Sequence, residues 1–351
     1  MRRLLLALAA LFLAAAGPDY AVVKPGVALQ FPRDHGAHPE FRTEWWYATG
    51  WLTTETGEQL GFQVTFFRIK PPVDQANPSA FAAKQVIFAH AALSDVKGRK
   101  LFHDQRIARA GFGLAGAKVG DTDVSVDGWR LVRTDDGQFR TRINTDAFGL
   151  DLVLTPTQAV LPQGRGGYSQ KGPAAAEASH YYSIPQLKVS GSIVRGGKRE
   201  AVSGKAWLDR EWSSTLLNPN ASGWDWLGLN MDDGGALTLF RMRDKAGAKL
   251  WGGGSYRDKG GVVTVFGPED VVFAPGRTWK SPRTGAAYPV APSVRYRVGG
   301  QWRSIAVTPL FDDQELDSRR GGGPVYWEGA VTVPGGRGFL EMTGYQAPLK
   351  M

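Results

Sequence analysis

Three short stretches of the 351-residue chain carry side chains that can move protons. The richest runs from Gly204 to Trp212, reads GKAWLDREW, and contains two carboxylates two residues apart. In an extended strand successive side chains point to opposite faces, which would put Trp207, Asp209 and Glu211 on one face. Repulsion between the carboxylates and burial against an aromatic ring raise the pKa of one of them. The stretch therefore predicts a general acid, Asp209, that can protonate a double bond or a leaving group.

The same stretch also has a purely structural interpretation. Leu208, Arg210 and Trp212 alternate with the carboxylates and belong to the other face of the strand. If Arg210 and other cations neutralise the two carboxylates, the strand has no catalytic acid. Both interpretations stay open at this point.

A second stretch, His180 to Pro185 (HYYSIP), places an imidazole next to phenols. If a strand begins here, His180 and Tyr182 point to the same side and can reach a common ligand. A histidine with an ordinary pKa near ~6.5 can donate or accept a proton at neutral pH. A histidine among aromatic residues is also common in a protein core, so a structural role is the alternative.

The third stretch, His35 to Tyr47, contains Glu44 and Trp46, which would share one face of a strand. Burying an unpaired carboxylate costs several kcal/mol, so Glu44 must be hydrogen-bonded or ion-paired, for instance with Arg42. This glutamate either takes part in the reaction or forms a buried ion pair that fixes the closure of a barrel.

Composition excludes several classes of site. The chain has no cysteine, which removes disulfides, thiolate metal sites and cysteine nucleophiles. The five histidines include only one close pair, His35 and His38, so we expect no metal site and no cofactor. The 42 Lys and Arg outnumber the 33 Asp and Glu, but they are dispersed, which argues against nucleic acid. Association with a membrane surface or other envelope components is compatible with this charge.

Residues 1–16 (MRRLLLALAALFLAAA) have the layout of a cleaved secretory signal peptide. Two arginines precede an apolar run that is too short to span a bilayer as a helix, and small residues end it. We therefore expect an exported protein, either periplasmic or extracellular.

The rest of the chain reads as an all-β protein. Short apolar or alternating runs are broken by Gly, Pro, Asn or Asp roughly every 8–12 residues, which is typical of sandwiches and barrels. The clearest predicted strands are Glu44–Thr53, Leu60–Ile69, Gln85–Leu93, Gly149–Thr155, Leu187–Val194, Lys205–Glu211, Trp226–Met231, Ala236–Arg243 and Phe339–Tyr345. The Gly/Ala/Pro-rich segment 162–179 is not expected to pair as a strand and is a candidate cover for a site. We place a domain boundary after residue 212, which gives domains 17–212 and 213–351.

Six motifs in this order resemble the AttH-like, carotenoid 1,2-hydratase family: Arg42–Tyr47, Phe88–Asp95, Arg106–Gly116, His180–Ser183, Trp207–Trp212 and Gly223–Trp226. The likeness covers nearly the whole chain after the signal segment. It implies two consecutive lipocalin-like β-barrels packed against each other. The family includes hydratases that add water to an isoprenoid double bond, relatives of pericyclic cyclases, and exported members described only as hydrolases.

The resemblance also implies roles for single residues. Asp209 matches the acid, His180 and Tyr182 match side chains that line its pocket, and Trp207 stands where the hydratases tend to have tyrosine. Tryptophan offers only an N–H donor and a π-face, which can shelter a carbocation. The side chains expected to contact substrate are Glu44, Trp46, Glu211, Trp224 and Trp226.

These observations predict an exported, cofactor-independent hydratase or hydrolase that acts by acid catalysis on an apolar, lipid-like or isoprenoid-like molecule. The alternative is a lipocalin-like carrier that holds a hydrophobic ligand without changing it. A third hypothesis is a carbohydrate-active β-protein that uses Asp209 and Glu211 as its acid and base.

Overall fold

The computed structural model describes residues 20–349, and these residues fold almost entirely into antiparallel β-strands. The predicted signal segment, residues 1–16, lies outside the described residues. Three short 3-10 helices accompany the strands: η1 (Arg33–His35), η2 (Pro268–Asp270) and η3 (Arg319–Gly321). None of the helices within residues 20–349 has the length and apolar character that crossing a membrane requires. The all-β prediction is confirmed.

The first sheet forms a nearly closed barrel. Its strands run in the order β4-β3-β2-β1-β13-β12-β9-β8-β7-β6-β5, and β10 and β11 add to β12. The strands β5 and β6 come back against β3 and β4 at the other end of this order. The bounds are β1 (Thr43–Thr54), β2 (Gln59–Ile69), β3 (Val86–Asp95), β4 (Lys100–Arg109), β5 (Ala115–Ala117), β6 (Asp123–Val126), β7 (Trp129–Arg133), β8 (Phe139–Asn144), β9 (Phe148–Thr155), β10 (Leu161–Pro162), β11 (Tyr168–Gln170), β12 (Ala178–Arg195) and β13 (Lys198–Ser213).

Two further sheets make up the rest of the chain. An eight-stranded sheet has the order β17-β16-β15-β14-β24-β23-β21, with β22 added to β23, and a three-stranded sheet has the order β18-β19-β20. Their strands are β14 (Ala221–Met231), β15 (Ala236–Asp244), β16 (Lys249–Arg257), β17 (Val263–Phe266), β18 (Val271–Lys280), β19 (Ala287–Val298), β20 (Gln301–Ala306), β21 (Thr308–Pro309), β22 (Glu315–Asp317), β23 (Val325–Val333) and β24 (Gly336–Met342).

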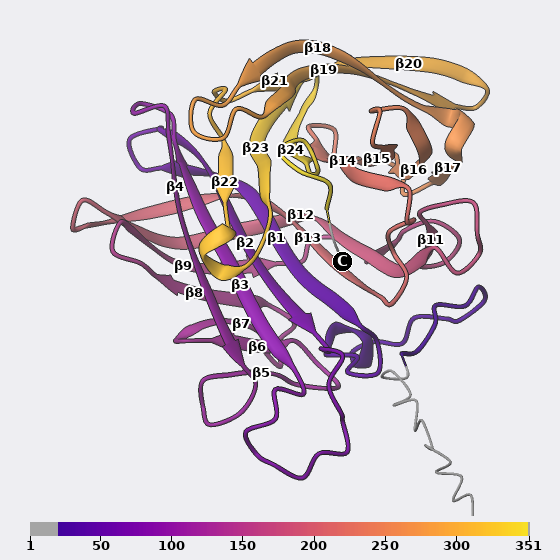
Figure 1. Cartoon of the computed structure of the whole chain (residues 1–351). Coiled ribbons are helices and arrows are strands. Elements are labelled where there is room, and N and C mark those ends of the chain that lie inside the picture. The colour runs from indigo at the N-terminus through magenta and orange to yellow at the C-terminus, as the bar shows by residue number, and fades with distance from the viewer. Residues whose placement is uncertain (1–19, 350–351) are drawn as a thin grey trace, which may run out of the picture.

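Four apolar clusters lie among residues 20–349, and the three largest hold these sheets together. The largest fills the first barrel, and a second lies between the eight-stranded and three-stranded sheets. The third joins the first sheet to the eight-stranded sheet and includes Tyr47, Trp51 and Trp207 from one side and Trp226 and Phe240 from the other. We call this contact the inter-sheet interface. Figure 1 shows the orange and yellow strands of the C-terminal part lying over the indigo to pink strands of the first sheet.

Sheet membership changes between β13 and β14, within residues 214–220, next to the predicted boundary after residue 212. The division into two domains stays a prediction. The expectation for segment 162–179 was wrong in part, because Tyr168–Gln170 pairs with β12 as β11 and Leu161–Pro162 pairs with it as β10. The glycines of this segment that have positive φ, Gly164, Gly166 and Gly167, make the tight turn that lets β11 return to β12.

Candidate active site

Asp209 lies in the inter-sheet interface, and three side chains donate hydrogen bonds to it. Its Oδ1 accepts from Ser183 Oγ at 2.5 Å and from Trp207 Nε1 at 2.6 Å. Its Oδ2 accepts from Tyr181 Oη at 2.8 Å. Asp209 is 3 % exposed, so these protein donors stand in for water around the carboxyl group.

Two of these donors are themselves fixed by a further hydrogen bond. Gln163 Nε2 donates to Ser183 Oγ at 2.8 Å, and Trp226 Nε1 donates to Tyr181 Oη at 3.1 Å. Both hydroxyl groups therefore direct their own protons to Asp209. Because Oδ1 receives two donors and Oδ2 receives one, Oδ2 is the oxygen with room for a proton.

The environment of Asp209 favours the neutral acid. Burial raises its pKa to about 7, an effect that the donors from Ser183, Trp207 and Tyr181 reduce and the charge of Glu211 increases. Among residues 20–349, no Lys or Arg forms an ion pair with this carboxyl group. A general acid works best when its pKa lies near the pH at which it operates. Asp209 meets that condition at neutral pH.

Glu211 lies on the same face of β13 but, unlike Asp209, has a cationic partner. Lys171 Nζ lies 3.2 Å from its Oε1, and Ser179 Oγ donates to the same oxygen. Lys171 comes from segment 162–179, and its ammonium lies over the rings of Phe240, at 4.3 Å, and Tyr181, at 4.7 Å. The segment thus supplies the cation for Glu211, and Arg210 points to the other face, as the alternation in the sequence predicts.

The structure does not bring His180 or Tyr182 to Asp209. On β12 the residues opposite Glu211 and Asp209 are Tyr181 and Ser183, so the side chains that alternate with them point into the first barrel. His180 packs against Trp212 there, with ring centroids 5.4 Å apart, and burial lowers its pKa to about 4. This placement corrects the expectation that His180 and Tyr182 line the pocket of the acid.

Tyr182 has a different partner inside the barrel. Its hydroxyl group lies 2.6 Å from His35 Nδ1, and both side chains are buried. The prediction that His180 and Tyr182 share one side of a strand is confirmed, but that side is the barrel core.

Glu44 is locked in a buried ion-pair network. It accepts hydrogen bonds from Arg68 and Arg210, and from the backbone N–H of His38 at 2.9 Å. Burial opposes ionisation, but Arg210, His38 and Arg68 outweigh it and hold the pKa of Glu44 well below its usual range. The suggested partner Arg42 is exposed and is not part of the network. These contacts support the structural interpretation, an ion pair that ties β1 to β2 and β13.

Trp46 belongs to the same network. The guanidinium of Arg210 lies over its ring at 3.8 Å, and its Nε1 donates to the carbonyl of His35 at 3.0 Å. Trp46 is fully buried in the core of the first barrel. Glu44 and Trp46 are therefore on the opposite face of the first sheet from Asp209, where they cannot contact a substrate of that acid.

Trp224 and Trp226 do lie at the inter-sheet interface. The ring of Trp226 contacts Tyr47, with centroids 5.4 Å apart, and Trp207, with centroids 6.3 Å apart. Trp224 is half-buried two residues earlier on β14. Both positions agree with the predicted role in holding substrate, which stays a prediction.

Several residues of this interface were not identified from the sequence. The donors Tyr181 and Ser183 follow from strand alternation only once the register of β12 against β13 is known. Two buried or half-buried carboxyl groups, Glu328 and Glu341, come from the second half of the chain and sit in no recognisable motif. Half-buried aromatic rings also line the first sheet next to this interface at Trp45, Phe67 and Phe88.

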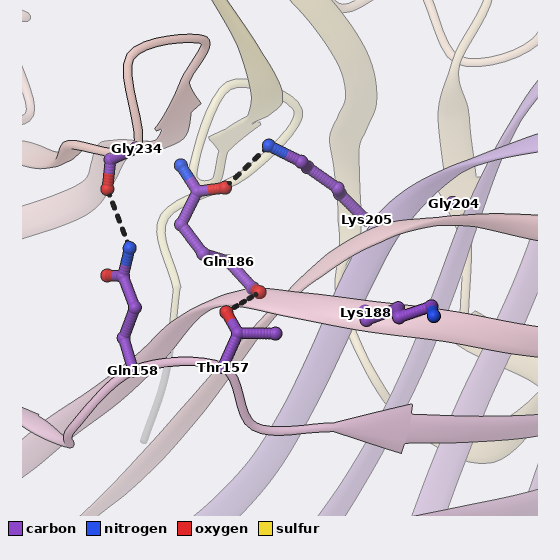
Figure 2. A pocket seen from close by; sticks show the side chains of 7 residues that line it. All are labelled: Thr157, Gln158, Gln186, Lys188, Gly204, Lys205 and Gly234. Carbon is purple, nitrogen blue, oxygen red and sulfur yellow. Dashed lines mark hydrogen bonds between the residues drawn. The ribbon is translucent and has the colours of Figure 1, made fainter.

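A groove of about 380 Å³ opens farther along the contact between the sheets. Figure 2 shows its lining, in which Lys205 Nζ donates to Gln186 Oε1 at 2.9 Å and Gln158 Nε2 donates to the carbonyl of Gly234 at 2.9 Å. Lys205 shares its face of β13 with Trp207 and Asp209, but Trp207 separates it from the acid along the strand. Asp209 does not line this groove.

Within residues 20–349, no group of three His, Asp or Glu side chains is arranged as a metal site.

The sequence and the fold both resemble those of known proteins. Residues 22–345 match the AttH-like family. The crystal structure of an AttH from Nitrosomonas europaea is 54% identical and superimposes with a TM-score of 0.85, covering 93% of this chain and 99% of that one. No curated protein matches the sequence.

Two more distant structures share the fold. Kievitone hydratase from Nectria haematococca is 17% identical with a TM-score of 0.68, covering 94% of this chain and 98% of that one. CghA, solved with Sch210972, is 13% identical with a TM-score of 0.51, covering 87% of this chain and 89% of that one. The match over nearly all described residues and the identity to the Nitrosomonas structure show that this chain belongs to the AttH-like family.

Proposed function

We propose that this protein is a cofactor-independent hydratase that adds water to a carbon–carbon double bond of an apolar, lipid-like or isoprenoid-like substrate. The observation that carries the proposal is the state of Asp209. It is a buried carboxyl group with three fixed donors, no cationic partner among the described residues and a pKa raised to about 7. Such a group can give a proton to an alkene at neutral pH.

The chemistry follows from that proton. The Oδ2–H bond of Asp209 breaks as a C–H bond forms on one alkene carbon, which leaves a carbocation on the other. Water then forms the C–O bond and loses a proton to a carboxylate. The carboxylate left on Asp209 keeps its donors from Ser183, Trp207 and Tyr181, which stabilise the charge it has just gained.

The aromatic residues around the acid suit a cationic intermediate. Trp207, Trp226 and Tyr47 lie in the same apolar cluster. A cation over an aromatic face gains about 2 kcal/mol or more when water is excluded. Trp207 has a second task, because its N–H fixes Oδ1 while its ring forms part of this apolar wall.

The relatives support the same class of reaction. Kievitone hydratase shares the fold over 94% of this chain, and its name describes addition of water. At 17% identity this likeness supports the fold, and the proposal for this chain depends on its own Asp209.

Heavy-oxygen water gives a direct test of the proposal. The purified protein is incubated in H₂¹⁸O with a panel of isoprenoid alcohols, prenylated phenols and unsaturated fatty acids. We expect an alcohol that carries one heavy oxygen from at least one substrate, with a zero rate in boiled protein. A full panel without a hydrated product, tested with a folded protein, would contradict the proposal.

The carrier hypothesis has one observation in its favour. The half-buried rings of Trp45, Phe67, Phe88 and Trp224 offer apolar surface for a ligand whether or not chemistry follows. Native mass spectrometry of protein purified from its own host separates the two functions. A tightly held lipid that is returned chemically unchanged, together with a silent alkene panel, would favour the carrier.

A further inference from the structure

Two glutamates of the C-terminal part face the acid of the first sheet. Glu328 on β23 and Glu341 on β24 are direct cross-strand partners. The next position in this row is Trp226 on β14, which pairs with Glu341. Since Trp226 lies in the inter-sheet interface, the two carboxyl groups lie on the face that meets the first sheet.

Contacts across the interface confirm this placement. Gln63 on β2 donates through Nε2 to Glu328 Oε2 at 2.7 Å. The same amide lies 3.3 Å from the hydroxyl group of Tyr326, which in turn lies 2.7 Å from His90 Nδ1. Glu328 therefore sits against the first sheet, at one end of a buried polar network.

No cation balances the two glutamates. Among the described residues neither Glu328 nor Glu341 forms an ion pair with Lys or Arg. Burial and the neighbouring Glu341 raise the pKa of Glu328, and burial, with the charges of Glu211 and Asp209, raises the pKa of Glu341. Adjacent carboxyl groups without a cation share a proton, because two like charges at that distance repel strongly.

The pair also has unused hydrogen-bonding capacity. Glu328 Oε1 and Tyr47 Oη are buried, and neither atom forms a hydrogen bond of ordinary geometry, although the two side chains interact with each other. Leaving such a group unsatisfied costs about 1–3 kcal/mol, which a bound polar ligand would recover. A water molecule with two or more polar partners suits such a position.

Tyr47 connects this pair to the acid. It is the cross-strand partner of Asp209 on β1, and its ring contacts Trp226, which pairs with Glu341. Asp209 and the two glutamates thus lie on opposing sheets, and the contact between Tyr47 and Trp226 joins the strand next to Asp209 to the strand next to Glu341. Glu341 is half-buried, so this side of the interface keeps some access to solvent.

We propose that Glu328 and Glu341 form a second acid–base centre of this site and that, with Tyr47, they bind the water molecule that adds to the substrate. The proposal rests on the proposed hydratase function and assigns the half of the reaction that Asp209 leaves open. It makes Asp209 the proton donor to carbon and the glutamate pair the proton acceptor from water.

The steps balance in protons and bonds. Asp209 loses the proton that forms the C–H bond, and the water bound at the pair forms the C–O bond and gives its proton to the carboxylate of the pair. After one turnover Asp209 is ionised and the pair holds one extra proton. Release of that proton to solvent and uptake of another by Asp209 restore the starting state, so the net reaction is addition of one water.

The experiment measures two rates in D₂O, the rate at which deuterium enters the recovered alkene and the rate of hydration. The first reports proton transfer from Asp209, and the second also requires addition of water. Reversible protonation by Asp209 places deuterium in the recovered alkene, whereas hydration also needs the water-binding centre. The variants are Glu328→Gln and Glu341→Gln, and the matched control is Glu315→Gln. Glu315 is a buried glutamate of β22 that accepts from Ser281 at 3.0 Å and Thr284 at 2.9 Å, outside the inter-sheet interface.

We expect each Gln variant of the pair to lower hydration by about 10²-fold or more while deuterium still enters the alkene at the wild-type rate. The control should keep both rates. Undiminished hydration in both pair variants, or a parallel loss of hydration and labelling, would overturn the proposal. A wild-type protein that neither hydrates nor labels any alkene would instead show that the proposed function itself fails.

Tyr47→Phe keeps the test decisive if a glutamate variant does not fold. The substitution removes a buried hydroxyl group that forms no hydrogen bond of ordinary geometry, so the free energy of unfolding should change by less than about 1 kcal/mol. We expect reduced hydration with unchanged deuterium labelling and this small change in stability. Full hydration activity in a folded Tyr47→Phe protein would contradict the assignment of the bound water to this position.

Discussion

Replacing Asp209 with Asn should lower the rate of hydration by about 10²- to 10⁴-fold, the usual contribution of a general acid. Asparagine has the size of aspartic acid but offers no proton of suitable acidity. Ser183, Trp207 and Tyr181 can still surround the side chain, so the barrel should remain folded. The rates are compared with the substrate found in the heavy-oxygen experiment, and near-ultraviolet circular dichroism confirms the fold.

The pH dependence of the wild-type rate belongs to the same test. Asp209 acts in its protonated form, so hydration should fall as the pH rises through about 7, the value to which burial raises its pKa. Wild-type turnover in a folded Asp209→Asn protein would remove Asp209 from the mechanism. A rate that rises steadily from pH 5 to pH 9 would show that a group other than this acid limits the reaction.

Replacing Glu44 with Gln should destabilise the protein by about 3–5 kcal/mol. The carboxylate holds Arg68 and Arg210, and both guanidinium groups are buried. Without it, two positive charges stay in the core of the first barrel with no anionic partner there, held only by backbone carbonyls, Gln85 Oε1 and the ring of His38. Equilibrium unfolding in urea measures this loss.

The matched control is Asp151→Asn, which breaks an exposed ion pair. Asp151 lies 3.3 Å from Arg142, and the two side chains are 47% and 69% exposed. Solvent screens such pairs, so the control should cost less than about 1 kcal/mol. Equal losses in Glu44→Gln and Asp151→Asn would mean that the buried network is not what ties β1 to β2 and β13.

Strand alternation explains why part of the site could be predicted. The division of β13 into a face with Trp207, Asp209 and Glu211 and a face with Arg210 depends only on the chain's own period of two. That pattern identified the buried acid and the position of its neighbour Glu211. The all-β fold was equally accessible, because short alternating runs separated by turn residues define it.

The errors have a different physical origin. The family resemblance implies that His180 and Tyr182 line the pocket of Asp209, but the register of β12 against β13 decides which side chains face the acid. A shift of one residue exchanges the two faces, and the local sequence does not encode that shift. As a result Tyr181 and Ser183, which hold Asp209, were overlooked.

The site residues of the eight-stranded sheet are harder to predict from the sequence. Glu328 and Glu341 lie more than 100 residues from Asp209 along the chain, and only the packing of one sheet on another brings them near it. Glu44 is the opposite case, a candidate site residue whose role is structural. Its aromatic surroundings suggested a site, but Arg68 and Arg210 approach it through long-range pairing and make it structural.

The most direct measurement is the titration of the Asp209 carboxyl group itself. In protein labelled with carboxyl-¹³C aspartate, the resonance that disappears in Asp209→Asn is followed by NMR as the pH is raised. A midpoint near 7, with the acid still neutral at mildly acidic pH, is the predicted result. A midpoint near the ordinary value of 3.8 would show an ionised carboxylate at neutral pH and would contradict acid catalysis by Asp209.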